Sequence, residues 1–312
     1  MKNRFPSLLL ISVLAAASQL KAELLIGLTI QNSLITFDSA TPGTITAPVA
    51  IGGLLAGEVL VGIDRRPQNG PNNGVLYGLG VNNVTGSGRI YTLNVTTGAA
   101  TPGSLLSADP ADSVAPTPYT NVSGNFYGVD FNPVVDRLRV VSSTGQNLRI
   151  NVDNGLVQLD VPLTFLAGDA NFGQAPAVGS VAYANNFGGT LTTELRGIHA
   201  TTTPDSLVTF ANPNGGTLMT VGALPFDATL GGYDISGLTG IPYFAVTSAG
   251  GPSQLYSGAT LTGTIGGGVQ VIGLAAQVGL PQSAVPDGGT TIALFLTSLL
   301  GLGIFARKKR LA

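Results

Sequence analysis

The chain has 312 residues, of which 10% are charged and 44 are glycine, and it contains no cysteine. This composition excludes a charged disordered coil and a helical bundle, which both need many Lys and Glu, and it excludes thiol catalysis and cysteine-based metal sites. Between Glu23 and Ala306, seven Arg and no Lys stand against all sixteen carboxylates, so this segment has a formal charge of −9 and no electrostatic footprint for nucleic acid.

The N-terminus is predicted to be a secretory signal peptide over residues 1–22. Lys2 and Arg4 form a positive start, and residues 6–17 form an apolar run that is too short to cross a bilayer. Small residues follow, and we expect cleavage between Ala22 and Glu23. The alternative is a buried N-terminal strand or helix. We therefore expect the folded domain to occupy residues 23–282.

A repeat runs through this domain. Each copy contains a Gly-containing strand, two further strands and a Gly-rich turn into a fourth. The third-strand anchors lie 56, 58, 59 and 48 residues apart at Leu34, Ile90, Leu148, Leu207 and Leu255. Units of this size with four short strands predict an all-β fold, a β-propeller of about five four-stranded blades. Four or six blades, a β-sandwich or a β-solenoid are the alternatives.

The N-terminal copy lacks a first strand. It starts with LLIGLT (24–29), which matches the second strand of the other copies. The segment VIGLAAQVGL (271–280) is predicted to return and complete this blade, because a blade built from both ends closes the ring and removes two exposed strand edges.

Three carboxylates occupy the same repeat position, two residues after a glycine: Asp64, Asp130 and Asp234. The first strand of a propeller blade borders the central channel, so these side chains are candidate ligands for Ca²⁺, which accepts several oxygens. The third copy breaks the pattern with Ala182. The alternative is that each Asp caps a nearby turn through backbone N–H groups. We expect no other cofactor or metal, and the single His199, near a strand end, is predicted to be structural.

Arg137 and Arg139 share one face of a predicted strand. They are candidates for clamping an anionic sugar or a carboxylate. The alternative is that they pair between blades with Asp130, Asp136 or Asp153.

The C-terminus contains a polar motif, an apolar run and a basic cluster. The motif lies within 283–289 and comprises Val285, Pro286, Asp287, Gly288 and Gly289. Residues 290–306 are long enough for a helix of about 26 Å, which predicts one transmembrane helix. The cluster within 307–312 is predicted to set the topology by remaining cytoplasmic: Arg307, Lys308, Lys309 and Arg310. A permanent anchor without cleavage is the alternative to removal.

Two stretches carry a resemblance to known families. GVDFNPVVDRLRVVSSTGQNLRINVDNG (128–155) resembles the bacterial domain of unknown function 4394 over residues 24–275. The resemblance implies an exported propeller-like domain without established catalytic residues. The tail is similar to VPDSG-type sorting signals within the wider PEP-CTERM type, with Gly288 where Ser is usual. That resemblance implies processing by an exosortase, membrane attachment before processing, and sorting to the envelope or extracellular matrix of a Gram-negative bacterium.

These features predict an exported, non-enzymatic propeller that binds or organises extracellular polysaccharide or protein. The alternative is a propeller glycoside hydrolase or lyase that uses the channel carboxylates, because the fold alone does not select a function.

Overall fold

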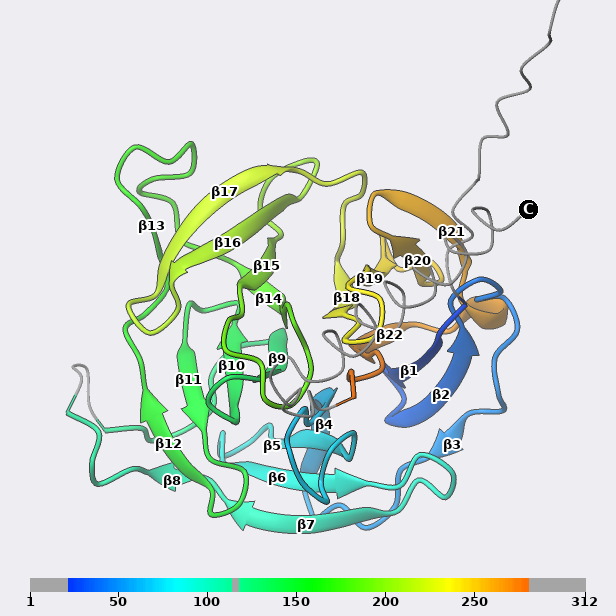
Figure 1. The fold of residues 1–312 in the computed structure, drawn as a ribbon, viewed down its shortest axis with the longest axis horizontal. Helices are drawn as coiled ribbons and strands as arrows, with labels where there is room; N and C mark the ends of the chain where they lie inside the picture. The colour runs from blue at the N-terminus through cyan, green and yellow to red at the C-terminus, as the bar shows by residue number, and fades with distance from the viewer. Residues whose placement is uncertain (1–21, 114–117, 281–312) are drawn as a thin grey trace, which may run out of the picture.

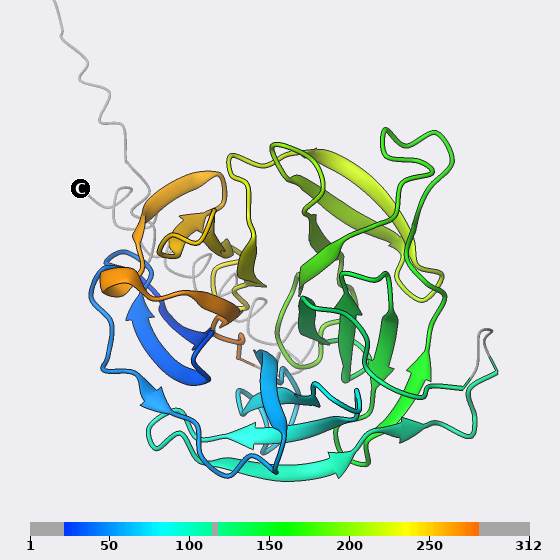
Figure 2. The same ribbon diagram turned by 180° about the vertical axis from the view of Figure 1, so that it is seen from behind.

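The computed structural model describes residues 22–113 and 118–280, which form five β-sheets arranged around a central axis (Figure 1). Figure 2 shows the same ring from behind. The predicted all-β propeller of five blades is confirmed. One 3₁₀ turn, η1 (Gly266–Gly268), accompanies the strands.

Each blade contains four antiparallel strands, which follow one another from the channel outward. The closing blade contains β22 (Val271–Ala275), β1 (Leu24–Thr29), β2 (Ser33–Asp38) and β3 (Val49–Ala50). Blade 2 contains β4 (Glu58–Arg65), β5 (Leu76–Asn82), β6 (Gly88–Leu93) and β7 (Ala100–Leu105). Blade 3 contains β9 (Tyr127–Asn132), β10 (Arg137–Ser142), β11 (Asn147–Ile150) and β12 (Leu156–Leu159). Blade 4 contains β14 (Val178–Tyr183), β15 (Leu195–His199), β16 (Ser206–Asn212) and β17 (Thr217–Ala223). Blade 5 contains β18 (Leu230–Ile235), β19 (Pro242–Thr247), β20 (Gln254–Ser257) and β21 (Thr260–Thr264).

The repeat read from the sequence corresponds to the blades. All five predicted anchors lie on third strands, namely β2, β6, β11, β16 and β20. The closing blade is also confirmed, because β22 pairs antiparallel with β1 from Ile26↔Ala275 to Thr29↔Val271. The ring therefore closes through strands from opposite ends of the domain.

Connections between blades cover several outer edges. β8 (Ser107–Ala108) pairs in parallel with β12, and β13 (Thr164–Phe165) pairs in parallel with β17. In each case the chain leaves one blade, runs along the outer edge of the next and then turns inward. Gly52 makes a similar parallel bridge with Ala99 beside β7. These additions satisfy backbone groups that an open edge would expose.

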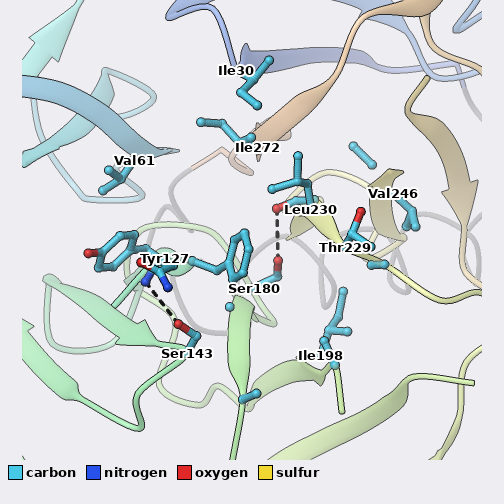
Figure 3. Close-up of a pocket in the computed structure, with 18 residues that line it drawn as sticks. Ile30, Val61, Tyr127, Ser143, Ser180, Ile198, Thr229, Leu230, Val246 and Ile272 are labelled. Atoms are coloured by element: carbon cyan, nitrogen blue, oxygen red, sulfur yellow. Dashed lines mark hydrogen bonds between the residues drawn. The ribbon is translucent and has the colours of Figure 1, made fainter. Parts of the chain in front are cut away.

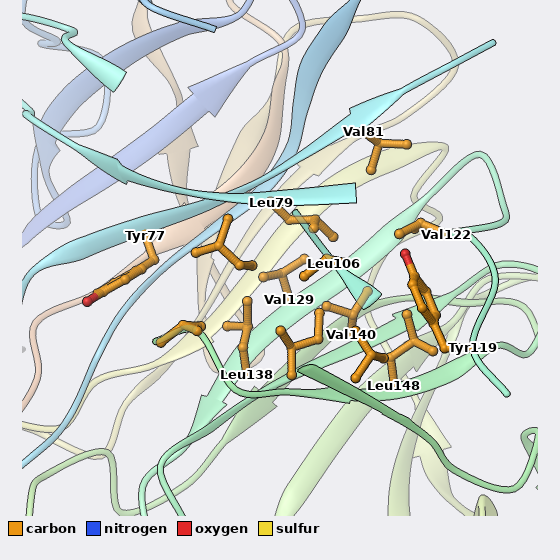
Figure 4. Packing of buried hydrophobic residues seen from close by; sticks show 14 of the residues in the cluster. Tyr77, Leu79, Val81, Leu106, Tyr119, Val122, Val129, Leu138, Val140 and Leu148 are labelled. Atoms are coloured by element: carbon orange, nitrogen blue, oxygen red, sulfur yellow. The ribbon is translucent and has the colours of Figure 1, made fainter. Parts of the chain in front are cut away.

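The core lies between the blades rather than within one central cluster. Figure 4 shows the cluster between blades 2 and 3, where Leu79 of β5 packs with Val129 of β9 and Leu138 and Val140 of β10. Four similar clusters fill other positions around the ring. Complete burial of one such side chain contributes about 1.5–3 kcal/mol, so this cysteine-free domain is stabilised by its sheet-to-sheet packing.

Glycines on the innermost strands allow the blades to approach closely. A Cβ atom at Gly62 would lie 2.4 Å from Val129 Cγ2, and one at Gly232 would lie 2.4 Å from the backbone nitrogen of Leu274. The five innermost strands thereby narrow the channel to a cavity of about 10 Å³ at its middle. The channel is a packed core with two different ends.

Within residues 22–113 and 118–280, no helix has the length and apolar character needed to span a bilayer. The predicted signal peptide (1–22), apart from Ala22, and the predicted transmembrane helix (290–306) lie outside the described residues.

Candidate functional site

The innermost strands divide the channel into three levels. Residues in their first halves, such as Val61 of β4 and Tyr127 of β9, surround a wide hollow at one end. The narrow cavity follows at the level of the glycines. Asp64, Asp130 and Asp234 then lie near the opposite ends of β4, β9 and β18. We call the hollow the bowl and the three carboxylates the aspartate cluster.

The structure brings the three predicted aspartates together. One carboxylate oxygen from each lies within 4.8 Å of those of the other two, and the side chains are 1%, 1% and 0% exposed, respectively. The equivalent positions in blade 4 and the closing blade are Ala182 and Ala275, so the ring of five positions has three acidic members. Their binding of a ligand or a cation stays a prediction.

Each aspartate also connects its blade to the next one. Phe131 N donates to Asp64 Oδ2 at 2.7 Å, Tyr183 N donates to Asp130 Oδ1 at 3.1 Å, and Ala276 N donates to Asp234 Oδ2 at 2.6 Å. In every case the donor is the residue directly after the position in the next blade that corresponds to the aspartate. The expected alternative, backbone capping, therefore occurs across blades rather than only within a local turn.

The second carboxylate oxygen has a different hydrogen-bonding state in Asp130 than in Asp64 and Asp234. Asp64 Oδ1 and Asp234 Oδ1 each accept a further bond, at 2.6 Å, from the backbone N–H of the following residue. Asp130 Oδ2 has no hydrogen-bond donor although it is buried. Asp64 and Asp234 are therefore held at both oxygens, and Asp130 presents one unsatisfied acceptor.

Burial raises the pKa of all three carboxyl groups. For Asp64 the second cause is repulsion from Asp234, and for Asp130 it is repulsion from both other aspartates. Burial raises the pKa of Asp234 to about 7, against the opposing effect of its backbone donors. Three buried carboxyl groups that repel one another favour a proton retained within the cluster when no other positive charge is present.

A segment that follows β22 covers the acidic end of the channel. This closing strap, residues 276–280, is held by Gly237 N donating to Gln277 O and by Gly279 N donating to Asn186 O, both at 2.8 Å. Gln277 N donates at 2.9 Å to the carboxylate of Glu23, which is 5% exposed. The strap therefore joins the two ends of the described chain, and the predicted cleavage site beside Glu23 stays a prediction.

The bowl lies at the other end of the channel and has a volume of about 600 Å³. All five innermost strands contribute to it, and Figure 3 shows the labelled side chains arranged around it. Among the residues that the structure describes, no charged side chain lines the bowl. The lining residues are Ile30, Val61, Asn125, Phe126, Tyr127, Ser143, Ala177, Gly179, Ser180, Ile198, Ala200, Ala228, Thr229, Leu230, Gly231, Ala245, Val246 and Ile272. Ile30 and Phe126 are 45% and 44% exposed, so apolar surface is available to a ligand.

Arg137 and Arg139 do not form an open clamp. Arg139 is 1% exposed and donates to Asp160 Oδ2 at 2.6 Å, with further bonds to Asn147, Asn214 and Tyr183. Arg137 donates to backbone oxygens of its own loop, at Val135 and Asp136. A clamp on a soluble anion needs two accessible guanidinium groups. Because Arg139 is buried, the suggested clamp is not formed.

Within the described residues, neither arginine forms the suggested ion pair with Asp130, Asp136 or Asp153, although Arg137 lies close enough to Asp153 to attract it. Arg66 of blade 2 is the residue that binds Asp136 and Asp153 of blade 3, at 2.6 and 2.7 Å. The physical reason is that strand register places the Arg139 side chain beside Asp160 rather than beside the loop that carries Asp136.

His199 ends β15 and is fully buried, which is consistent with the predicted structural role. Its Nδ1 accepts from Ala177 N at 3.2 Å, and its Nε2 lies 2.6 Å from Thr201 Oγ1. Phe165 packs edge-on against the ring. Burial lowers the pKa of His199, so the imidazole is neutral at pH 7.

A family model of the domain of unknown function DUF4394 matches residues 33–275. The chain belongs to the DUF4394 family. The VPDSG-CTERM motif matches residues 284–309, which include the predicted motif from Val285 to Gly289. No curated protein matches the chain.

Solved structures similar to this DUF4394 chain resemble it only distantly. A nidogen/laminin complex has a TM-score of 0.45 and 8% identity, covering 82% of this chain and 98% of that one. A protein of unknown function from Bacteroides thetaiotaomicron has a TM-score of 0.37 and 14% identity, covering 75% and 55%. Dipeptidyl peptidase 4 from Porphyromonas gingivalis has a TM-score of 0.29 and 12% identity, covering 75% and 29%.

The sorting motif implies a processing and sorting system of the exosortase type, and with the propeller fold it indicates an exported cell-envelope protein of unknown function. The motif residues, the helix over 290–306 and the basic cluster from Arg307 to Arg310 lie outside the described residues. Their boundaries and their roles in topology stay predictions.

The sequence interpretation missed the bowl, the strap and Arg65. Arg65 lies near the aspartate cluster and donates through Nη1 to Gly74 O at 2.7 Å. Its position next to Asp64 was a usable signal. The bowl had no comparable signal, because its apolar residues resemble ordinary strand residues.

Proposed function

We propose that this chain is a non-enzymatic binding protein of the cell envelope, and that the bowl holds an apolar segment of a partner protein. The observation that carries the proposal is a hollow of about 600 Å³ whose described lining has exposed apolar side chains and no charged one. Ligand sites are concave and mostly apolar, with a few polar groups that set orientation. In the bowl, Ser143 and Thr229 supply such groups.

The lining of the bowl favours binding over glycoside chemistry. Hydrolysis of a glycosidic bond needs two carboxyl groups that flank the bond in an accessible pocket. In the described part of the chain, the bowl lining contains no carboxylate, and the aspartate cluster is buried beneath the strap. An acidic polysaccharide would also meet no cationic side chain among the described residues that line the bowl. These facts support a protein ligand over the sugar hydrolase or lyase alternative.

The position of the bowl supports a role at the cell surface. The described chain ends at Leu280, the last residue of the strap, and the sorting motif follows within a few residues. The bowl lies at the other end of the channel. Attachment through the tail would therefore leave the bowl open toward the exterior.

A photo-crosslinking amino acid in place of Phe126 tests the proposal in the full chain, expressed in its own host. We expect one defined protein adduct, reduced about tenfold or more by Leu230→Lys, because a charge would have to be buried against the ligand. Two matched positions serve as controls. Val84 is 93% exposed at the same end, and Leu238 is 57% exposed in the loop after β18 at the opposite end.

Neither control position should give this adduct, and Leu238→Lys should leave the Phe126 adduct unchanged. Equal crosslinking from Val84, or an adduct that survives Leu230→Lys, would show that the bowl is not the binding site. Retention of the protein by host polysaccharide, with no protein adduct from Phe126, would favour sugar binding instead.

A further inference from the structure

We propose that Asp64, Asp130 and Asp234 form a buried site for one hard divalent cation, best suited to Ca²⁺, that locks three blades together at the closed end of the channel. The site is independent of the bowl. Among the described residues these three form the only group of potential metal-ligating side chains with this convergence.

The spacing of the oxygens fits a single ion. Because one oxygen from each carboxylate lies within 4.8 Å of the others, a common centre lies within about 2.8 Å of all three. Ca²⁺ binds carboxylate oxygens at about 2.3–2.6 Å and tolerates irregular geometry, so only a small inward shift is needed. No His or Cys joins the group, which disfavours zinc and copper.

The second observation is the unsatisfied oxygen of Asp130. This side chain is 1% exposed, and its Oδ2 has no donor. Its partners in the cluster, Asp64 and Asp234, are oriented by two backbone donors each, so they cannot rotate away without losing those bonds. A buried acceptor without a donor costs free energy, and a cation beside it removes that cost.

The charge around the cluster is not balanced by the described side chains. No ion pair joins any of the three aspartates to a basic side chain in residues 22–113 and 118–280. Arg65 is a cation close to Asp64, but it forms no ion pair with Asp64, and Glu23 adds a further carboxylate close to Asp234. A proton or a metal ion must therefore supply the missing positive charge.

Protons and the cation compete for the same oxygens, which makes the site testable. The full chain is purified in mild detergent, stripped of metal with a chelator, and unfolded by heat at pH 8 with increasing CaCl₂. We expect a saturable rise in Tm of about 3 °C or more, because the ion binds only the folded state. MgCl₂ should act more weakly, and NaCl of equal ionic strength should not reproduce the rise.

Asp130→Asn is the decisive variant, because its amide oxygen still accepts from Tyr183 N while one ligand charge is lost. We expect it to fold and to need at least about tenfold more Ca²⁺. Glu194→Gln is the matched control, since Glu194 lies at the same end, is half-exposed and is outside the cluster. It should respond as the wild type does.

A wild-type measurement provides a second test that does not depend on a variant. The Ca²⁺ response should shrink between pH 8 and pH 5, because protonated carboxyl groups do not bind the ion. No rise in Tm at millimolar Ca²⁺ and pH 8 would overturn the proposal in favour of proton sharing. An equal response in Asp130→Asn, or a response that does not change with pH, would place the effect elsewhere and overturn it as well.

Discussion

The two ends of one channel differ in almost every physical respect. The bowl is wide, its described lining is uncharged and partly apolar at the exposed rim, and its residues come from several positions of the repeat. The aspartate cluster is buried and acidic, is covered by a strap, and comes from one repeat position. The same five strands thus support a surface suited to recognition at one end and an electrostatic junction between blades at the other.

The largest expected effect on the free energy of unfolding comes from forcing two of the innermost strands, β18 and β22, apart. Gly232→Val places a side chain 2.4 Å from the backbone nitrogen of Leu274, so blade 5 and the closing blade must move apart. We expect a loss of about 3 kcal/mol or more in the free energy of unfolding, or failure to fold. Gly222→Val on β17, where a Cβ meets nothing within 4 Å, is the control. Urea denaturation of both variants measures the difference, and equal stability would contradict the close packing of the channel.

A smaller difference in stability is expected between two substitutions in the aspartate cluster. Asp64 accepts from Arg65 N and Phe131 N, so in Asp64→Asn one of these donors faces the amide NH₂ group and loses its acceptor. Asp130 accepts only from Tyr183 N, and the amide oxygen of Asp130→Asn can keep that bond. Both changes remove one charge. In a chelator at pH 7, we expect Asp64→Asn to be less stable than Asp130→Asn by about 1–3 kcal/mol in urea denaturation. The reverse order would mean that charge repulsion outweighs the bonds between blades.

The pH dependence is expected to be smaller and specific to the acidic end. The pKa of Asp234 is raised above that of an unfolded aspartate, to about 7, so the folded state holds the proton more tightly. Its contribution to stability is complete below about pH 4 and is lost as pH rises through about 7. Metal-free protein should therefore lose stability across this window. Asp234→Asn should reduce the slope without abolishing it, because burial also raises the pKa of Asp205, to about 6. A wild-type profile that rises with pH would refute this assignment.

The smallest effect on stability is expected in the bowl. Ile30 is 45% exposed, and Ile30→Ser should change the free energy of unfolding by less than about 0.5 kcal/mol. The same change should weaken the Phe126 crosslink, since it removes apolar contact area from the rim. A large loss of stability would show that the bowl is part of the core rather than a recognition surface.

The sequence predicted the features that depend on repetition. Five anchors and a missing first strand were enough to expect the blades and their closure, and the shared position of Asp64, Asp130 and Asp234 placed them beside the channel. Pairing that depends on register could not be predicted, so Arg139 was assigned to the wrong carboxylates. The bowl was not predictable, because Ile30 lies on a turn after a second strand and Leu230 begins a first strand, and neither shares a pattern.

The closing blade also determines when the ring can be completed. Its inner pair joins Ile26 to Ala275, which are 249 residues apart, so β1 has an unpaired inner edge until almost the whole domain has been synthesised and moved across the membrane. Contacts between such distant residues form slowly, and an open strand edge invites pairing with other chains. The nascent chain is therefore most vulnerable to aggregation just before β22 arrives, and a chaperone that shields the edge of β1 would act in that interval.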